Sequence, residues 1–297
     1  MKKYLAIIIT AAAILAVSQA AQGADHCVRA GAAGSDTGVD WINAYTALPD
    51  VLVRGDTYYV AEGDYPQLRI DDDVNGNLWI YIKKATPSAH GPGTGWTDSY
   101  GDGQAVFPKI LIRASSHVTT GGNIEIDGVT GSGTSGHGFC IRNSDDTVSL
   151  FHVQYYYFEG NSGNIILRHT EICHTNYILD DGADGVYINA ASPDLHDFTF
   201  SHLYIHDVSR NGFTFTAGSN YLVEHCVLAR NHNTAVTHAQ GMQITNCHNV
   251  TVRYCWFEDI RGTAHIALIG TNVTASNMYV YRNIFFNNDG LTGMSQS

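Results

Sequence analysis

Val223-Glu224-His225-Cys226-Val227-Leu228 is one of five copies of a six-residue pattern in the C-terminal half of this 297-residue chain. The other copies are Leu167-Arg168-His169-Thr170-Glu171-Ile172, Phe200-Ser201-His202-Leu203-Tyr204-Ile205, Val252-Arg253-Tyr254-Cys255-Trp256-Phe257 and Val280-Tyr281-Arg282-Asn283-Ile284-Phe285. Successive copies start 33, 23, 29 and 28 residues apart. Periods of about 20 to 50 residues are typical of solenoids and propellers, in which each repeat buries its apolar face by stacking on its neighbours.

The columns of this pattern carry separate information about the fold. Columns one and six are apolar in every copy and are expected to face a core, whereas column two varies and is expected to face solvent. Strands that begin at a glycine precede the pattern; they are Gly185-Val-Tyr-Ile188, Gly212-Phe-Thr-Phe215 and Gly241-Met-Gln-Ile244. Each coil then holds three short strands and no helix. This favours an all-β fold, a parallel β-helix of about eight to ten coils, over a propeller or a leucine-rich horseshoe.

The first 24 residues have the layout of a secretory signal peptide. Lys2 and Lys3 precede an apolar run from Leu5 to Val17, and small residues follow it. The run is too short to span a bilayer as a helix. We therefore expect residues 1–24 to be removed on export, and the mature protein to be secreted to the medium, the cell surface or the periplasm with no membrane segment.

Residues 25–55 do not repeat and are predicted to cap a single β-helix domain over residues 56–297. Asp40 is a suitable N-cap for a short amphipathic helix from Trp41 to about Leu48. Terminal coils need such a cover because their apolar end would otherwise meet water. The sequence therefore predicts a short capping helix at the N-terminal end of the solenoid.

Composition excludes a general nucleic-acid-binding surface. The chain carries 28 acidic and 16 basic residues, a formal net charge of -12, and loss of Lys2 and Lys3 makes the mature chain more acidic still. Binding to a phosphate backbone without sequence preference requires a basic surface. Contact with a polyanion would then depend on a local cluster of arginines or on a bridging cation.

Two sets of motifs resemble a known group of proteins. The Gly-x-x-Ile/Phe and Val-x-x-Asn/Cys-x-Ile/Phe elements of residues 138–286 resemble those of the right-handed parallel β-helix group typified by the pectate lyases. The N-terminal block, with Trp41-Ile-Asn-Ala44 and Arg54-Gly-Asp-Thr-Tyr-Tyr-Val-Ala61, is similar to the start of many exported bacterial β-helix proteins of unassigned function. The resemblance implies a right-handed β-helix. It leaves the activity open, because this architecture hosts lyases, hydrolases, adhesins and inert shafts.

The resemblance to the lyases implies a calcium ion, held by aspartates, that neutralises the carboxylate of a uronic acid. Calcium takes several oxygen ligands at once. Asp180, Asp181 and Asp184 bring three carboxylates into the turn before the Gly185 strand. We therefore predict a calcium site in this turn. A solvated acidic turn is the alternative, because Asp and Gly are common turn formers.

Arginines are the candidate bases and carboxylate ligands, because no lysine follows Lys109. Arg168 and Arg253 share column two, which predicts that both lie on one face, three coils apart. We assign Arg253 to a catalytic site and Arg168 to binding of a sugar carboxylate through a bidentate contact. Plain surface arginines are the alternative.

Histidines near one turn of successive coils are the candidate acid/base groups. His238 and His265 both lie close to the start of a glycine-led strand, where two imidazoles could act as general acid and base. Gln240, two residues after His238, is predicted to contact the substrate. By contrast, His169, His202 and His225 share column three, which predicts a structural ladder of stacked rings continued by Tyr254 and Arg282 rather than a converging metal site.

Two further side-chain types complete the candidate residues. Trp256 is predicted to lie against a sugar ring, with packing as the alternative. Cys226 and Cys255 share column four, so their backbones are expected to lie about 4.8 Å apart in adjacent coils, within reach of a disulfide. Two buried free thiols are the alternative.

These observations lead to two hypotheses for the function. The first is a secreted protein that binds an acidic extracellular polysaccharide and, as an enzyme, cleaves it by β-elimination. Hydrolysis of the polygalacturonase type is disfavoured because Gly136-His137-Gly138 precedes the aspartates instead of following them. The second is a non-catalytic structural or adhesin-like shaft. Phe285 is followed by 12 residues without an amphipathic cover, so we expect this end to continue in a longer chain or to meet a partner or another copy.

Overall fold

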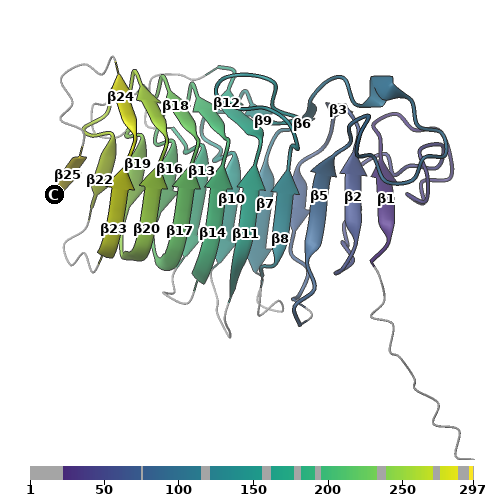
Figure 1. Cartoon of the computed structure of the whole chain (residues 1–297), viewed down its shortest axis with the longest axis horizontal. Coiled ribbons are helices and arrows are strands. Elements are labelled where there is room, and N and C mark those ends of the chain that lie inside the picture. The colour runs from purple at the N-terminus through teal and green to yellow at the C-terminus, as the bar shows by residue number, and fades with distance from the viewer. Residues whose placement is uncertain are drawn as a thin grey trace, which may run out of the picture.

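The chain forms a solenoid whose coils stack along the long axis of the molecule (Figure 1). The computed structural model describes residues 23–74, 76–114, 121–155, 162–176, 182–190, 195–232, 239–269, 275–286 and 294–296. Almost all of the predicted signal peptide, residues 1–22, lies outside these ranges. Within them, no helix has the length and apolar character needed to cross a membrane.

Three parallel sheets run along the solenoid. Each coil after the first contributes one strand to each sheet, and the first coil contributes β1 alone. Sheet 1 contains, in spatial order, β1 (Asp25–Val28), β2 (Thr57–Val60), β5 (Ile80–Lys84), β8 (Ile124–Asp127), β11 (Ser162–Arg168), β14 (Leu195–Ser201), β17 (Gly218–Glu224), β20 (Cys247–Arg253) and β23 (Ser276–Tyr281). Sheet 2 contains β3 (Gly63–Asp64), β6 (Ala105–Phe107), β9 (Phe139–Asn143), β12 (Thr170–His174), β15 (Tyr204–His206), β18 (Val227–Ala229), β21 (Trp256–Glu258) and β24 (Ile284–Phe286). Sheet 3 contains β4 (Leu68–Ile70), β7 (Ile110–Ala114), β10 (Phe151–Tyr155), β13 (Val186–Ala190), β16 (Phe213–Phe215), β19 (Met242–Ile244), β22 (Ile266–Leu268) and β25 (Met294–Gln296).

This arrangement confirms the prediction of an all-β parallel β-helix. Sheet 1 has nine strands in the described residues, within the predicted eight to ten coils. The six-residue pattern corresponds to the end of a sheet 1 strand, a corner, and a sheet 2 strand. Columns one and six point inward, as predicted, and in the first four copies their side chains are fully buried in one core that extends along the solenoid.

The histidine ladder of column three is also present. The rings of His169, His202, His225 and Tyr254 stack at centroid distances of 4.9, 5.0 and 5.0 Å, and the Arg282 guanidinium lies 5.5 Å from the Tyr254 ring centroid. All five residues adopt positive φ angles, between 51° and 58°. This left-handed conformation turns the chain sharply from sheet 1 into sheet 2 in each coil. The ladder is therefore a structural device of the corner.

A second ladder, of asparagines, was not predicted. Asn220, Asn249 and Asn277 lie in successive sheet 1 strands, and all three have positive φ angles. The amide nitrogen of Asn249 donates to Asn220 Oδ1 at 3.0 Å, and that of Asn277 donates to Asn249 Oδ1 at 2.8 Å. Asn is among the residues that tolerate the left-handed region best, so the same residue type satisfies both the backbone and the coil-to-coil hydrogen bonds.

The predicted N-terminal capping helix is wrong, although its segment does cover the first coil. The Asp40 carboxylate accepts hydrogen bonds from the N–H groups of Ile42 (3.0 Å) and Asn43 (2.8 Å), which closes a local turn. Tyr45 then pairs with the backbone on either side of Val28, so the chain runs as an added bridge beside β1. Pairing with β1 thus takes the backbone groups that a helix would have used.

The buried anchor of this N-terminal segment is Trp41, which is fully buried. Its indole N–H donates to the His90 carbonyl at 3.2 Å, and its ring lies edge-on to Trp96 at 4.8 Å. The long segment between β5 and β6, which contains the 3₁₀-helix η1 (Asp98–Tyr100), therefore packs back onto the N-terminal segment. Leu52, which is 2% exposed, joins the main core at this end.

The corner geometry predicts the effect of two substitutions at His202. Both His202→Gly and His202→Val remove the ring from the stack, but glycine adopts φ near 53° without strain and a β-branched residue does not. We expect His202→Val to lower the free energy of unfolding by about 1–2 kcal/mol more than His202→Gly. Urea titration followed by circular dichroism measures both; equal losses would contradict the backbone argument.

Candidate functional site

The predicted calcium ligand Asp184 is a structural residue of the corner between sheets 2 and 3. Its Oδ1 accepts hydrogen bonds from the Asn211 N–H at 3.1 Å and the Thr214 hydroxyl at 2.9 Å, and its Oδ2 lies 3.4 Å from Arg210 Nη1. The side chain is fully buried. Its oxygens already serve protein donors, so Asp184 does not fit a calcium ligand. Asp180 and Asp181, the other two predicted ligands, lie outside the described residues.

Gln240 and His265 occupy the same corner in later coils. The Gln240 N–H donates to Asn211 Oδ1 at 3.1 Å, and its side-chain amide donates to the Thr263 hydroxyl at 2.8 Å. His265 is 2% exposed, and its ring lies edge-on to Phe285 at 4.8 Å. Both side chains are therefore packed inside the corner. His238 lies outside the described residues.

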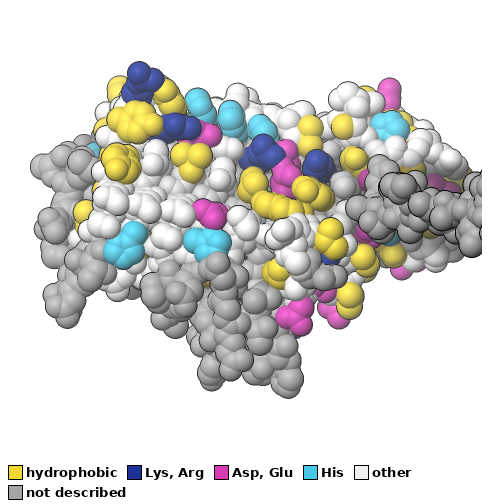
Figure 2. Space-filling model, turned by 60° about the horizontal axis from the view of Figure 1, so that its bottom comes forward, with side chains coloured by type: hydrophobic (Ala, Val, Ile, Leu, Met, Phe, Trp, Pro, Cys, Tyr) yellow, Lys and Arg dark blue, Asp and Glu magenta, His cyan; other side chains and the backbone are white. Residues whose placement is uncertain are grey.

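Arg168 and Arg253 lie on the outer face of sheet 1, in one column and three coils apart, as the repeat predicted. Acidic and basic side chains alternate on this face, and the histidine ladder follows one of its edges (Figure 2). Arg168 forms ion pairs with Glu125 and Asp127, and Arg253 Nε donates to Glu224 Oε2 at 2.8 Å. These pairs neutralise both guanidinium groups and make the face zwitterionic.

The six cysteines are buried free thiols in this structure. Cys226 and Cys255 stack in the corner between sheets 1 and 2, as their shared column predicted. Burial, together with the neighbouring Cys255 thiol, raises the pKa of Cys226 well above its usual value. The structure thus has the free-thiol alternative rather than the disulfide.

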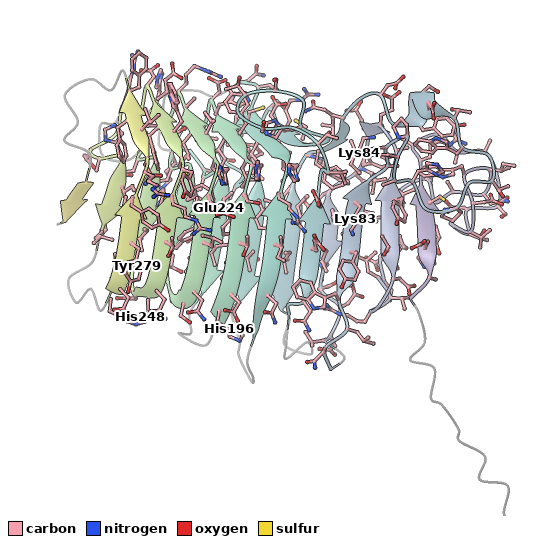
Figure 3. The ribbon with its side chains drawn as sticks, in the orientation of Figure 1. Lys83, Lys84, His196, Glu224, His248 and Tyr279 are labelled. Atoms are coloured by element: carbon pink, nitrogen blue, oxygen red, sulfur yellow. The ribbon has the colours of Figure 1, made fainter. Side chains whose placement is uncertain are left out.

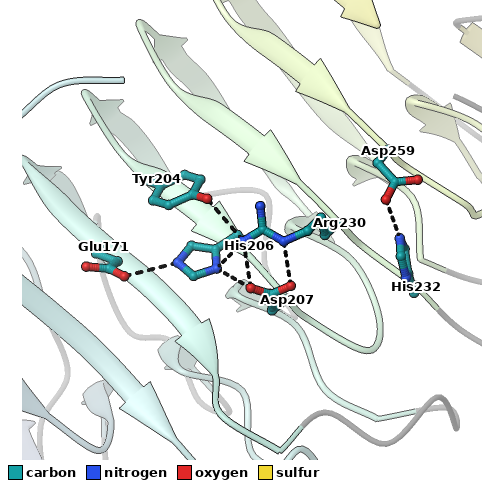
Figure 4. Close-up of polar contacts among 7 residues, drawn as sticks. All are labelled: Glu171, Tyr204, His206, Asp207, Arg230, His232 and Asp259. Atoms are coloured by element: carbon teal, nitrogen blue, oxygen red, sulfur yellow. Dashed lines mark hydrogen bonds and ion pairs between the residues drawn. The ribbon is translucent and has the colours of Figure 1, made fainter. Parts of the chain in front are cut away.

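A polar cluster that sequence reasoning missed lies on the outer face of sheet 2 (Figure 4). The Nε2 atom of His206 lies 3.1 Å from Glu171 Oε1, and its Nδ1 atom lies 2.6 Å from Asp207 Oδ2. Arg230 donates from Nε and Nη2 to the two oxygens of Asp207, each at 2.7 Å. Gln104 donates to the second Glu171 oxygen at 2.7 Å. These five residues, which we call the sheet 2 cluster, connect four coils.

The titration behaviour of the sheet 2 cluster follows from these bonds. Burial acts to lower the pKa of His206, but hydrogen bonds to Asp207, Cys173 and Glu171 outweigh it and raise this pKa to about 11. The hydrogen bond from His206 lowers the pKa of Glu171 to about 2. Burial opposes ionisation of Asp207, but Arg230 and His206 hold its pKa well below its usual range. At neutral pH the cluster therefore has two negative and two positive charges.

Aromatic side chains border the sheet 2 cluster on the same face. Tyr204, Val227 and Trp256 are register partners in β15, β18 and β21 and point outward together. The Tyr204 ring stacks on the His206 ring at 4.0 Å, and its hydroxyl accepts a hydrogen bond from Arg230 Nη2 at 3.1 Å. The Trp256 side chain, predicted to contact sugar, is exposed. Val227 lies between the two rings in this row, and Arg230, just after β18, reaches back to Tyr204 in the preceding coil.

A pocket of about 170 Å³ adjoins this face and is lined in part by Lys84, Gln104 and His137. Lys84 lies at the end of β5 (Figure 3), and its Nζ donates to the Ala85 carbonyl at 2.7 Å. Burial lowers the pKa of Lys84 to about 8. Gln104 bonds to Glu171, and the His137 ring lies 6.3 Å from that of Tyr204, so the pocket is continuous with the sheet 2 cluster.

The missed residues have a common place in the repeat. Glu171 and Tyr204 occupy column five, as does Trp256, which was predicted, and His206, Asp207 and Arg230 follow column six by one or two residues. Because successive side chains of a strand point to opposite faces, the positions on either side of inward column six must face outward. That alternation was the available signal. Chemical type does not repeat at these positions, so the repeat itself did not identify them.

The buried lysine generates a pH prediction. Its folded pKa, near 8, lies below the usual value of 10.5, so between these values the unfolded chain binds more protons and stability rises with pH. The unfolding free energy of the wild type, measured against Lys84→Met, should therefore increase by up to about 3 kcal/mol from pH 7.5 to 10.5. Urea titrations of both proteins test this, and a constant difference would refute it.

Comparison with known proteins supports the fold alone. No curated protein and no solved structure matches the chain. A family model described as the right handed beta helix region matches residues 110–297, which is more than half of the sequence. The three stacked parallel sheets agree with it, and the chain belongs to the right-handed β-helix family.

Proposed function

We propose that this protein is exported and binds an acidic extracellular polysaccharide along the outer face of sheet 2. The observation that carries the proposal is the position of Arg230 beside Tyr204, on the face that also carries the exposed Trp256, with 40% of the Arg230 side chain exposed. The hydrogen bonds that the structure describes for Arg230 use Nε and Nη2, and none of them uses Nη1. A guanidinium edge beside aromatic rings suits a sugar carboxylate and the apolar faces of neighbouring sugars.

The spacing of this face suits an extended chain. Tyr204 and Trp256 are two strands apart, or about 9.6 Å along the solenoid axis. A polysaccharide lying along the axis would place successive sugars over successive coils. Recognition would depend on the local guanidinium edge, because the charges of the sheet 2 cluster cancel and the chain as a whole is acidic.

Cleavage by β-elimination is the enzymatic form of this proposal. Arg230 would neutralise the uronate carboxylate, which acidifies the proton on the adjacent ring carbon. The Tyr204 oxygen, as a phenolate, would take that proton, a carbon–carbon double bond would form, the bond to the glycosidic oxygen would break, and Tyr204 would return the proton to that oxygen. The hydroxyl of Tyr204, 3.1 Å from Arg230 Nη2, is the group placed for proton transfer. Calcium stays a prediction and enters this proposal as a condition of the assay.

A non-catalytic shaft is the second candidate function, and one observation favours it. Arg253 lies on the face of sheet 1, whereas Asp184 and His265 are buried in the corner between sheets 2 and 3. These predicted site residues do not share a groove. The exposed apolar side chains of β24 suit the predicted contact with a partner or another copy.

Substitution of Arg230 tests the proposal. We expect Arg230→Ala to weaken binding to pectate, alginate or a glycosaminoglycan at least tenfold in affinity electrophoresis, because the carboxylate contact is lost. Arg69→Ala is the matched control: Arg69 is also an exposed arginine paired with an aspartate, but it lies on sheet 3. Absorbance at the unsaturated-uronate band, with and without calcium, tests cleavage. If the wild type binds none of these polymers, the shaft is the better description.

A further inference from the structure

Two cysteines lie against the sheet 2 cluster and form, together with Glu171, a group of potential metal ligands. Cys140 is on β9, and Cys173 is on β12 beyond Glu171. The two sulfur atoms and a Glu171 oxygen all lie within 4.8 Å of one another. His206 Nε2 is 3.1 Å from Glu171 Oε1 and faces the same group. Cys140, Cys173 and His206 are less than 10% exposed, so the three-residue group and the imidazole beside it lie at a nearly dry position.

We propose that Cys140, Cys173, Glu171 and His206 form a binding site for a thiophilic divalent cation of the Zn²⁺ type. Two sulfurs, one imidazole nitrogen and one carboxylate oxygen are the ligand types that Zn²⁺ takes in four-coordinate sites. Zn–S bonds of about 2.3 Å place two sulfurs about 3.8 Å apart in a tetrahedron, which is within the range of the present positions. The proposal concerns metal binding and does not rest on the proposed polysaccharide function.

The surrounding hydrogen bonds have the form expected around metal ligands. Asp207 Oδ2 lies 2.6 Å from His206 Nδ1, and Arg230 Nη2 lies 2.9 Å from the same nitrogen. When His206 donates its Nδ1–H to Asp207, Nε2 is left to coordinate once Glu171 also turns to the metal. Arg230 holds Asp207 through both carboxylate oxygens. Gln104 holds the second oxygen of Glu171 at 2.7 Å. The contacts Asp207–His206, Arg230–Asp207 and Gln104–Glu171 thus hold the ligands in place, and all three would survive metal binding.

Strand geometry argues against a disulfide between the same two cysteines. Cys140 is the register partner of Glu171, so Cys173 is two residues further along the adjacent strand. A strand spacing of about 4.8 Å and a two-residue rise of about 6.6 Å place the Cα atoms about 8 Å apart. Disulfides rarely span more than about 7 Å between Cα atoms. A metal ion bridges this diagonal without moving the backbone, because the side chains reach toward each other.

The soft ligands also separate this site from the predicted calcium site. Calcium prefers six to eight oxygen ligands, whereas this group offers two sulfurs and one nitrogen. A metal here would join β9, β12 and β15 and would lie next to the stacked rings of Tyr204 and His206. The metal would therefore cross-link three coils on the face where we propose that the polysaccharide binds.

Cobalt is the probe that tests this proposal. Full-length mature protein, reduced and stripped of metal, should bind one Co²⁺ per chain, with a thiolate-to-cobalt charge-transfer band and the intense visible bands of a tetrahedral ion. Addition of Zn²⁺ should remove these bands. Cys173→Ser and Glu171→Gln should each weaken binding, and Cys173→Ser should also reduce the charge-transfer band by about half because one of two thiolates is lost. Asp207→Asn should keep the bands and weaken binding about 10- to 100-fold.

Matched controls keep the test independent of folding. Cys226→Ser removes a thiol that is equally buried but lies in the corner between sheets 1 and 2, and it should leave the cobalt spectrum unchanged. Circular dichroism confirms that each variant is folded. Three outcomes would overturn the proposal: no charge-transfer band in folded wild type, a band that Cys173→Ser leaves intact, or a Cys140–Cys173 disulfide found by peptide mapping of unreduced protein.

Discussion

Parallel backbone pairing between coils, in a fixed register, is the constraint on which the rest of this structure depends. Each strand of sheet 1 pairs with the corresponding residues of the coils before and after it. A slip of one residue would exchange the inward and outward faces of a strand, and would place fully buried residues such as Phe200 and Val223 in solvent. Burial of columns one and six therefore holds the register, and the register places every other side chain.

A fixed register turns repeated residues into ladders. The imidazoles of His169, His202 and His225 stack because equivalent backbone positions in adjacent coils are separated by one strand spacing. The asparagine ladder obeys the same rule and adds hydrogen bonds from coil to coil. The histidine ladder lies at the corner between sheets 1 and 2, whereas the asparagine ladder lies within the sheet 1 strands. Both occupy left-handed backbone positions, and neither brings ligands together. Repetition in this chain therefore indicates structure, and chemistry has to be sought where repetition stops.

This distinction explains which features could be predicted from the sequence. The parallel β-helix, the inward columns, the histidine ladder and the shared column of Arg168 and Arg253 all follow from the repeat, and all are present. The capping helix failed because pairing of Tyr45 beside β1 overrides a local helical signal. The roles given to Asp184 and His265 stay predictions, and the burial of both side chains inside a corner is a feature that their motifs do not show. The contact between Gln104 and Glu171 could not be predicted from the sequence either, because the two residues are 67 positions apart in the chain.

The sheet 2 cluster shows how a repetitive scaffold produces a unique site. Asp207 and Arg230 occupy the same left-handed corner position in adjacent coils, with φ angles of 52° and 55°. Elsewhere such positions carry like residues that stack, but here they carry opposite charges, so Arg230 reaches back to both oxygens of Asp207. Asp207 then orients His206, and His206 points across the coil to Glu171. A left-handed corner position that builds a ladder from identical residues therefore orients an imidazole when the residues differ, and no change of backbone is required.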